Sequence, residues 1–240
     1  MCIFPLLILG LSTYVFPRIF ASMDPVREMA MQMAMLLFLV VILTFGGFFL
    51  AAMGTFLLLE HKDEHTLSTI AVTPVGAGGY IRFKMAYIYL MSVLSNIVVL
   101  LGTKVLAGEH YSIGGVSLFD NLSLAHIISY ALISALFAPT LALLQAAFAK
   151  NEVEGFAFIK GTGIVAPLPA LLVLQTFYGA KQYLLGVFPN FWPTKAVMLK
   201  LFPIPASANL SYPLYLIIGG IYSLLILIAA YRFFLKRTQY

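Results

Sequence analysis

The sequence predicts an all-α integral membrane protein, a six-helix transmembrane bundle with a short polar helix on the cytoplasmic side between the second and third spans. Two observations predict this fold. Hydrophobic residues make up 62% of the 240 residues, charged residues only 10%, and mean hydropathy is +0.99, whereas a soluble domain carries about a quarter charged residues. The apolar residues also form long runs without charge that lack the strict alternation of a membrane β-strand. Helices are then the backbone arrangement that a bilayer core admits.

Each span is placed on one charge-free run, because a bilayer core takes about 20 apolar residues per helix. The expected spans cover about 1–17, 29–59, 80–106, 121–149, 156–180 and 206–232, in a single domain over 1–240. Pro17 is expected to end the first span. The second span is longer than a bilayer needs, so it tilts or its ends leave the membrane.

The segment between the fifth and sixth spans holds the only tryptophan of the chain, Trp192, among prolines and Lys195. Such residues suit the outer membrane interface, where an aromatic ring sits at headgroup level and a lysine extends toward water. The prolines divide the segment into short pieces, which is typical of a re-entrant or interfacial helical excursion.

The charge of the chain indicates contact with lipid headgroups rather than with nucleic acid. The net charge is +5 and the pI about 9.3, but the basic residues are scattered at span ends. Basic residues are enriched on the cytoplasmic side of membrane proteins, so Arg232, Lys236 and Arg237 predict a cytoplasmic C-terminus. With six spans the N-terminus is then cytoplasmic as well, and so are the segments 60–84 and 150–155. This orientation leaves eight Lys and Arg inside and six outside.

The segment 60–84 is a charged island between 29–59 and 85–103, which contain no charge at all. A polar helix held between two membrane spans provides a surface that a cytoplasmic partner can bind. Acids at Glu60, Asp63 and Glu64 are expected in the first turn of this helix, where they complement the helix dipole. Leu67 and Ile70 follow at helical spacing and form a small apolar patch suited to docking.

The island also contains the pattern H-x-x-E-H at His61, Glu64 and His65. On a helix the two histidines share one face at the spacing of metal ligands, as in inverted zinc-peptidase motifs. An intramembrane zinc enzyme is therefore an alternative interpretation, with Glu152 or Glu154 as third ligand. However, short strings of His and acids arise by chance in charged loops, and the chain offers no large soluble domain for a substrate cleft. We expect no metal site and no catalytic residue.

The glycines at Gly161-Thr162-Gly163 do not form a nucleotide-binding loop, because they lack the G-x-x-x-x-G-K-[ST] pattern and enter a membrane span. No other phosphate-binding motif occurs in the sequence. We therefore expect that the chain binds no cofactor and hydrolyses no ATP by itself.

Polar residues inside the expected spans are candidates for the lining of a transport pathway, since intramembrane polar groups face the bundle or a cavity. Together with a methionine from the Met-rich, adaptable start of the second span, the candidates are Gln32, Met35, Asn96, Gln145 and Gln175. Hydrogen bonding between helices, worth ~0.6 kcal/mol each, is the competing interpretation. No Asp or Glu lies in mid-span, which argues against a proton-coupled carrier.

Taken together, these features resemble the permease subunits of type 2 ATP-binding-cassette exporters, and among them the fluoroquinolone-type export permeases. The resemblance covers essentially the whole chain. Its basis is six spans in a half-size chain, an acidic string before Thr66-Leu67, a later Thr-Pro pair with Lys84 opening the third span, and the Pro-aromatic-Trp-Pro-Thr-Lys element at 189–195. Two features depart from the family pattern. His65 stands where the family usually has Gly, and the usual amphipathic helix before the first span is missing, which suggests a truncated start.

The resemblance implies that the charged island is a coupling helix, which docks in a groove of a separate ATPase subunit. The residues expected to form this contact are Glu60, Lys62, Asp63, Glu64, Thr66, Leu67, Ile70, Thr73 and Pro74. A second cytoplasmic contact is expected in the tight turn before the fifth span, at Lys150, Glu152 and Glu154.

The expected function is that of a transmembrane permease subunit of an ATP-driven exporter in a bacterial or archaeal inner membrane. It would move a drug, lipid or hydrophobic peptide, as a homodimer or with a paralogous permease, while the partner ATPase binds ATP and Mg. The alternatives are the zinc enzyme described above and a channel that does not depend on nucleotide.

Overall fold

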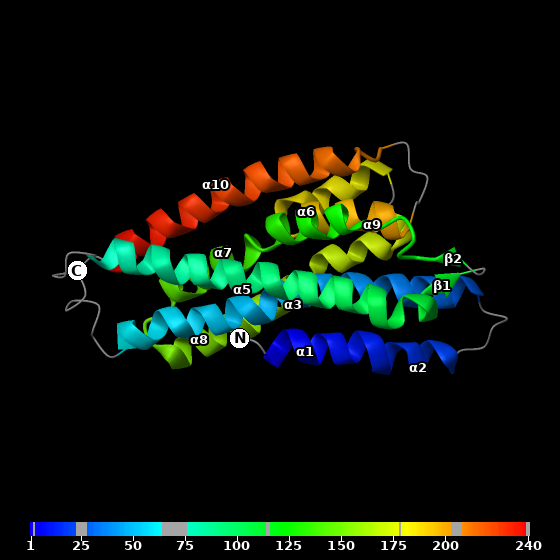
Figure 1. Cartoon of the computed structure of the whole chain (residues 1–240). Helices are drawn as coiled ribbons and strands as arrows, with labels where there is room; N and C mark the ends of the chain where they lie inside the picture. Colours follow the sequence, from blue (N-terminus) through cyan, green and yellow to red (C-terminus); the bar gives the residue numbers. More distant parts are fainter. Residues whose placement is uncertain are drawn as a thin grey trace.

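The computed structural model describes residues 1, 3–22, 28–63, 76–113, 116–177, 179–202 and 208–238 of the chain. Within these residues the chain is a bundle of helices (Figure 1), and the only strands described are a two-residue pair. Six helical segments are long and apolar enough to cross a membrane: Ile3–Ala21, Met33–Glu60, Gly78–His110, Leu124–Phe148, Glu152–Val173 and Tyr212–Arg237. The predicted all-α, six-span fold is confirmed.

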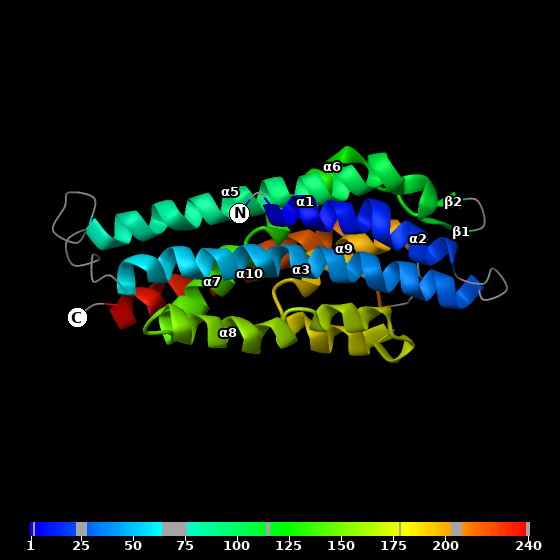
Figure 2. The same ribbon diagram turned by 90° about the horizontal axis from the view of Figure 1, so that it is seen from below.

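Two long helices, α3 (Glu28–Asp63) and α5 (Gly76–Ala107), run antiparallel along the bundle (Figures 1 and 2). The second span lies at the centre, because 61% of the residues in its most apolar stretch are buried, against 28–33% for the first, third, fifth and sixth spans. α3 is apolar on all sides, as expected of a helix enclosed by other helices. It contacts α1, α2, α5, α7, α8 and α9 and forms the axis of the bundle.

The first span is one continuous helical segment, made of α1 (Ile3–Gly10), a π-helical turn η1 (Leu11–Val15) and α2 (Phe16–Ala21). The prediction that Pro17 ends this span is wrong. Pro17 lies in the first turn of α2, where its missing N–H is not needed. The wider π-helical turn before it relieves the clash that a proline causes in a regular helix.

The fourth span consists of two helices rather than one, α6 (Leu124–Ser134) and α7 (Phe137–Phe148), joined by a turn at Ala135 and Leu136. Pro139 accounts for the break, because proline has no N–H to donate to the carbonyl of Ala135 four residues earlier. The start of α6 is fixed by Ser123, whose hydroxyl accepts a hydrogen bond from the backbone N–H of His126.

The fifth span is interrupted half-way. α8 (Glu152–Val165) ends before Pro167, and three 3-10 segments follow: η4 (Leu168–Val173), η5 (Gln175–Phe177) and η6 (Gly179–Val187). The expectation of a regular membrane helix over 156–180 is therefore wrong in its second half. Pro167 and Pro169 prevent the regular hydrogen bonding of an α-helix there, and the chain continues in short, tighter turns.

The remaining elements are α9 (Phe191–Leu201), α10 (Tyr212–Thr238) and, between α5 and α6, the 3-10 turn η3 (Gly108–His110) with strands β1 (Ser112–Ile113) and β2 (Val116–Ser117). The strands are antiparallel, with Ser112 opposite Ser117. α9 packs against α10 and α6.

The predicted extension of the Lys195 side chain toward water is not what the structure shows. The indole N–H of Trp192 donates to the carbonyl of Gly186 at 3.0 Å, and the side chain of Lys195 is only 6% exposed. Both residues lie on α9, which is packed between other helices rather than lying flat at the surface. Lys195 therefore does not extend toward water.

The close contact between α9 and α10 depends on one of two adjacent glycines, which gives a matched test. A Cβ atom on Gly219 would lie 2.5 Å from Cβ of Trp192, an atom fixed by the backbone. A Cβ atom on Gly220 would lie 3.1 Å from Cδ1 of Ile133, at the movable end of a side chain. We expect Gly219→Ala to lower the melting temperature in detergent by several degrees, because α9 and α10 must separate. Gly220→Ala should change it little, and equal effects of the two variants would contradict this packing.

Candidate functional site

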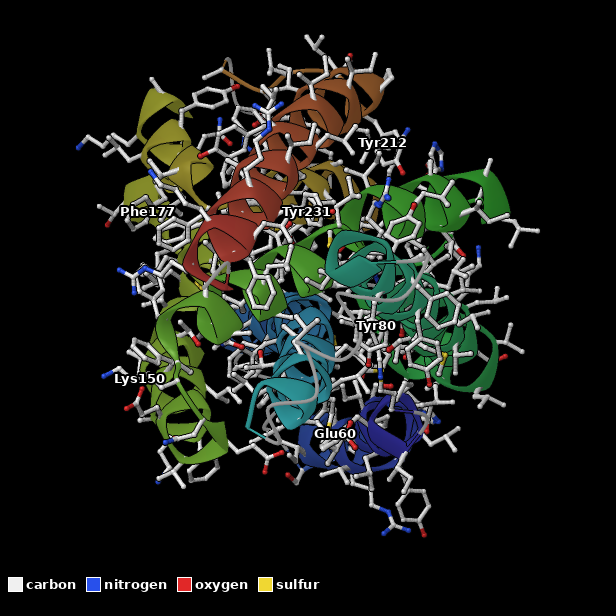
Figure 3. All side chains as sticks on the ribbon, turned by 90° about the vertical axis from the view of Figure 1, so that its left-hand side faces the viewer. Glu60, Tyr80, Lys150, Phe177, Tyr212 and Tyr231 are labelled. Carbon is white, nitrogen blue, oxygen red and sulfur yellow. The ribbon has the colours of Figure 1, made fainter. Side chains whose placement is uncertain are left out.

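Four helix ends gather at one end of the bundle, which we call the α3–α8 end: α3 and α10 end there, and α5 and α8 begin there (Figure 1). Figure 3 looks along the bundle onto this end, with Glu60 of α3, Lys150 before α8 and Tyr231 of α10 labelled. Glu60 is exposed. The expected first and second cytoplasmic contacts, as far as they are described, thus lie at the same end of the molecule.

The start of α8 is held by a reciprocal set of hydrogen bonds. The side chain of Asn151 accepts from the backbone N–H of Glu154 at 2.9 Å, and the carboxylate of Glu154 accepts from the backbone N–H of Lys150 at 2.9 Å. Glu152 and Glu154 lie in the first turn, where their charge complements the helix dipole. The turn that presents Lys150 and Glu152 is therefore well defined.

The adjoining ends of α5, α7 and α10 are tied together by aromatic residues. The hydroxyl of Tyr231 donates to the carbonyl of Gly78 at 3.1 Å. The guanidinium of Arg237 lies 5.4 Å from the ring centre of Phe148 and 5.3 Å from that of Phe233, within cation–π distance. Arg237 also lies in the last turn of α10, where a positive charge is favourable.

The dipole argument for the acids of the charged island needs correction. Glu60 and Asp63 lie in the last turn of α3 and not in the first turn of a separate helix, so the dipole does not stabilise them. Lys62 and Asp63 belong to α3 by their backbone, but their side chains lie outside the described residues. The other expected coupling residues lie outside them altogether: Glu64, Thr66, Leu67, Ile70, Thr73 and Pro74.

The zinc-site pattern also falls largely on this part of the chain, since Glu64 and His65 lie outside the described residues. Among the residues that are described, no three His, Cys, Asp or Glu side chains come together as metal ligands.

Of the candidate pathway residues, Gln145 of α7 has the most definite environment. Its side chain is buried and joins three helices: its amide oxygen accepts from the hydroxyl of Thr55 on α3, and its Nε2 donates to the hydroxyl of Thr162 on α8 at 2.5 Å. This arrangement corresponds to hydrogen bonding between helices, the competing interpretation. Gln145 thus connects α3 and α8 at the level of Thr55, inside the bundle from Glu60 at the α3–α8 end.

Of the other pathway candidates, Met35 lies far from Gln145. Met35 packs in a core cluster with Phe20 and Tyr111, twenty residues and so about 30 Å along α3 from Thr55. Asn96 is buried on α5, and its Nδ2 has no hydrogen-bond partner among the residues described. Gln32 lies in α3 and Gln175 in η5, but their side chains are outside the described residues.

An apolar cavity of about 300 Å³ lies where the fifth span breaks. It lies between α7, α8, the connection before α9, and α10, and it is lined by Phe137, Thr140, Leu141, Leu144, Thr162, Val165, Ala166, Phe188, Pro189, Asn190 and Ile226. The sequence analysis missed these residues. The signal that could have found them is the pair Pro167 and Pro169, because interrupted membrane helices often border binding sites.

Comparison with known proteins decides the class of this molecule. A family model described as "Fluoroquinolones export permease protein Rv2686c-like" matches residues 1–231. The chain belongs to this family. Two curated relatives from Mycobacterium tuberculosis, the fluoroquinolones export permease proteins MT2760 (strain CDC 1551 / Oshkosh) and Rv2686c (strain ATCC 25618 / H37Rv), are each 26% identical over 185 residues. The match covers 76% of this chain and 65% of each relative. The chain thus spans less than two thirds of the length of these relatives, and no solved structure matches it.

Membership in an export permease family and six membrane-crossing helices make this a multi-pass membrane protein of the transport class. The family resemblance seen in the sequence is therefore confirmed. Asp63, where α3 ends, and Gly76, where α5 begins, both lie at the α3–α8 end.

Proposed function

We propose that the chain is the transmembrane permease subunit of an ATP-driven exporter, and that it moves an amphiphilic drug of the fluoroquinolone kind out of the cell. A separate ATP-binding-cassette ATPase would bind ATP and Mg. Two permease chains, identical or paralogous, would pair with two such subunits. The observation that carries this proposal is the family match over residues 1–231, with relatives named as fluoroquinolone export permeases.

The α3–α8 end supports the choice of the docking surface. α3 ends at Asp63 and α5 begins at Gly76 at this end, where the turn that presents Lys150 and Glu152 also lies. The sequence between the two helices, 64–75, contains polar and charged residues, as this turn does. An ATPase that closes on ATP and displaces 64–75 would move the ends of α3 and α5 directly.

The hydrogen bonds of Gln145 suggest how such a displacement would spread. Because its amide joins Thr55 of α3 to Thr162 of α8, movement of α3 would be passed to α8, whose end borders the cavity. The switch between inward-open and outward-open states would then be a rigid-body movement whose balance ATP shifts.

The test is co-purification of the detergent-solubilised chain from its native membrane. The double variant Asp63→Lys/Glu64→Lys is expected to lose the ATPase subunit that the wild-type chain retains, and to lose norfloxacin efflux, because two acids on the proposed docking segment change sign. The matched control is Glu109→Lys/Asp120→Lys, which reverses two exposed acids near the opposite end of the bundle. Recovery of the wild-type chain without an ATPase, and with stoichiometric zinc, would overturn the proposal in favour of the enzyme.

A further inference from the structure

The cavity at the break of the fifth span has the properties of a small-molecule site. Its volume of about 300 Å³ lies at the lower end of the range for ligand pockets. Its walls are mainly apolar, with aromatic rings from Phe137 and Phe188, and no Lys, Arg, Asp, Glu or His lines it. A dry apolar cavity of this kind binds apolar molecules rather than water.

The residues with polar side chains that line the cavity are few, and they make hydrogen bonds within the protein. The hydroxyl of Thr140 donates to the carbonyl of Leu136 at 2.7 Å, and that of Thr162 to the carbonyl of Phe158 at 2.8 Å. The side chain of Asn190 is only 4% exposed, and its Nδ2 donates to the carbonyl of Ala166 at 2.9 Å. The cavity thus presents an almost wholly apolar wall to a ligand.

The break in α8 explains why the cavity persists. Beyond Val165 the chain turns away in a 3-10 segment, so no further α-helical turn fills the space beside α7 and α10. The Nδ2 group of Asn190 donates to the carbonyl of Ala166 just after the end of α8. In an uninterrupted helix, this carbonyl would accept a hydrogen bond from a backbone N–H of the next turn. Membrane transporters commonly place their substrate beside such interrupted helices near the middle of the bilayer.

We propose that this cavity binds the ring system of an amphiphilic aromatic molecule, held by the apolar and aromatic walls. The proposal rests on the export function proposed above and names the site for its substrate. The walls match a flat, uncharged ring system, and Val165, which is 42% exposed, lies at the edge of the cavity.

The binding test uses norfloxacin and the single tryptophan of the chain. Trp192 lies two residues from Asn190, so energy transfer from its indole to norfloxacin reports occupation of the cavity. In the purified wild-type chain we expect saturable quenching of the Trp192 emission. Val165→Phe, at the mouth of the cavity, should weaken this binding tenfold or more. The matched control is Ile164→Phe on the adjacent residue, which is 77% exposed and does not line the cavity, and which should bind as the wild type does.

A second variant tests whether loss of binding follows from filling the cavity rather than from a change at Val165 alone. Ala166→Leu narrows the cavity from its closed end and keeps the backbone carbonyl that Asn190 binds, so it should also weaken binding about tenfold. Absence of saturable quenching in the wild type, or wild-type affinity in both Val165→Phe and Ala166→Leu, would overturn the proposal. So would quenching by a phospholipid with brominated acyl chains that Val165→Phe abolishes while norfloxacin has no effect, because the occupant would then be a lipid tail.

Efflux from cells that contain the partner ATPase separates failure of the site from failure of the function. If the wild-type chain supports efflux but both cavity variants bind norfloxacin as the wild type does, the proposed site is wrong and the export function stands. Absence of wild-type efflux overturns the export function, while the binding measurement still decides whether the cavity takes an aromatic amphiphile.

Discussion

Replacing Gly155 with leucine is expected to destabilise the protein by about 3 kcal/mol, because the new side chain has no space. Gly155 lies in the first turn of α8 and is buried against α3, where an added Cβ would overlap Cδ1 of Leu59. Leu59 is itself fully buried in the core cluster of the α3–α8 end and has little freedom to move. The melting temperature in detergent, measured by loss of helical circular dichroism, should fall by several degrees.

The same helix provides the control for this experiment. Gly161 is exposed, and a Cβ atom there would meet nothing within 4 Å. Gly161→Leu should leave the melting temperature unchanged or raise it slightly, since leucine favours helix more than glycine does. In the double variant Gly155→Leu/Leu59→Ala, the space freed on α3 should restore part of the lost stability. A Gly155→Leu protein as stable as Gly161→Leu would show that α3 and α8 do not meet closely at this point.

Lys195 is the site of the second large effect, and here the substitution should stabilise the protein. Burial lowers the pKa of its ammonium group from the usual 10.5 to about 8. Keeping the group charged in the folded protein below pH 8 therefore costs about 3 kcal/mol relative to the unfolded chain. Methionine has a similar length and no charge, so Lys195→Met should raise the melting temperature at pH 7 by several degrees.

The pH dependence follows from the direction of this pKa shift. Between pH 8 and 10.5 the unfolded chain binds more protons at Lys195 than the folded protein does, so the stability of the wild type should rise with pH over this interval. Thermal unfolding of wild type and Lys195→Met from pH 7 to pH 10 should therefore give values that converge. Lys181→Met, at an exposed lysine, should follow the wild type at every pH. A Lys195→Met protein less stable than the wild type at pH 7 would show that the ammonium group has a binding partner.

The sequence predicted the fold class well because charge-free length decides which segments enter a bilayer, and this quantity can be read directly from the residues. It predicted the interior of the spans less well, because the effect of a proline depends on its neighbours. Pro17 was expected to end the first span, but a π-helical turn allows the helix to continue past it. Pro139 and Pro167, in contrast, interrupt spans that are continuous by hydropathy alone.

The candidate site could be predicted only in part for a related reason. The grouping of Glu60 with Lys150 and Glu152 follows from the alternation of spans, which places successive loops on opposite sides. The cavity does not follow from any local pattern, since Thr162 and Asn190 line it together only because α8 ends where it does. The burial of Lys195 likewise depends on the packing of α9, which no sequence motif indicates.

One consequence of the length of α3 is mechanical. The helix runs without interruption for 36 residues, and a rod of that many residues is about 54 Å long, well beyond the ~30 Å of a bilayer core. No proline lies within it to act as a joint. A rotation of about 10° around one end of such a rod carries the other end through about 9 Å. As a rigid lever that pivots near Glu28, α3 would turn by only a small angle for a large displacement of Asp63.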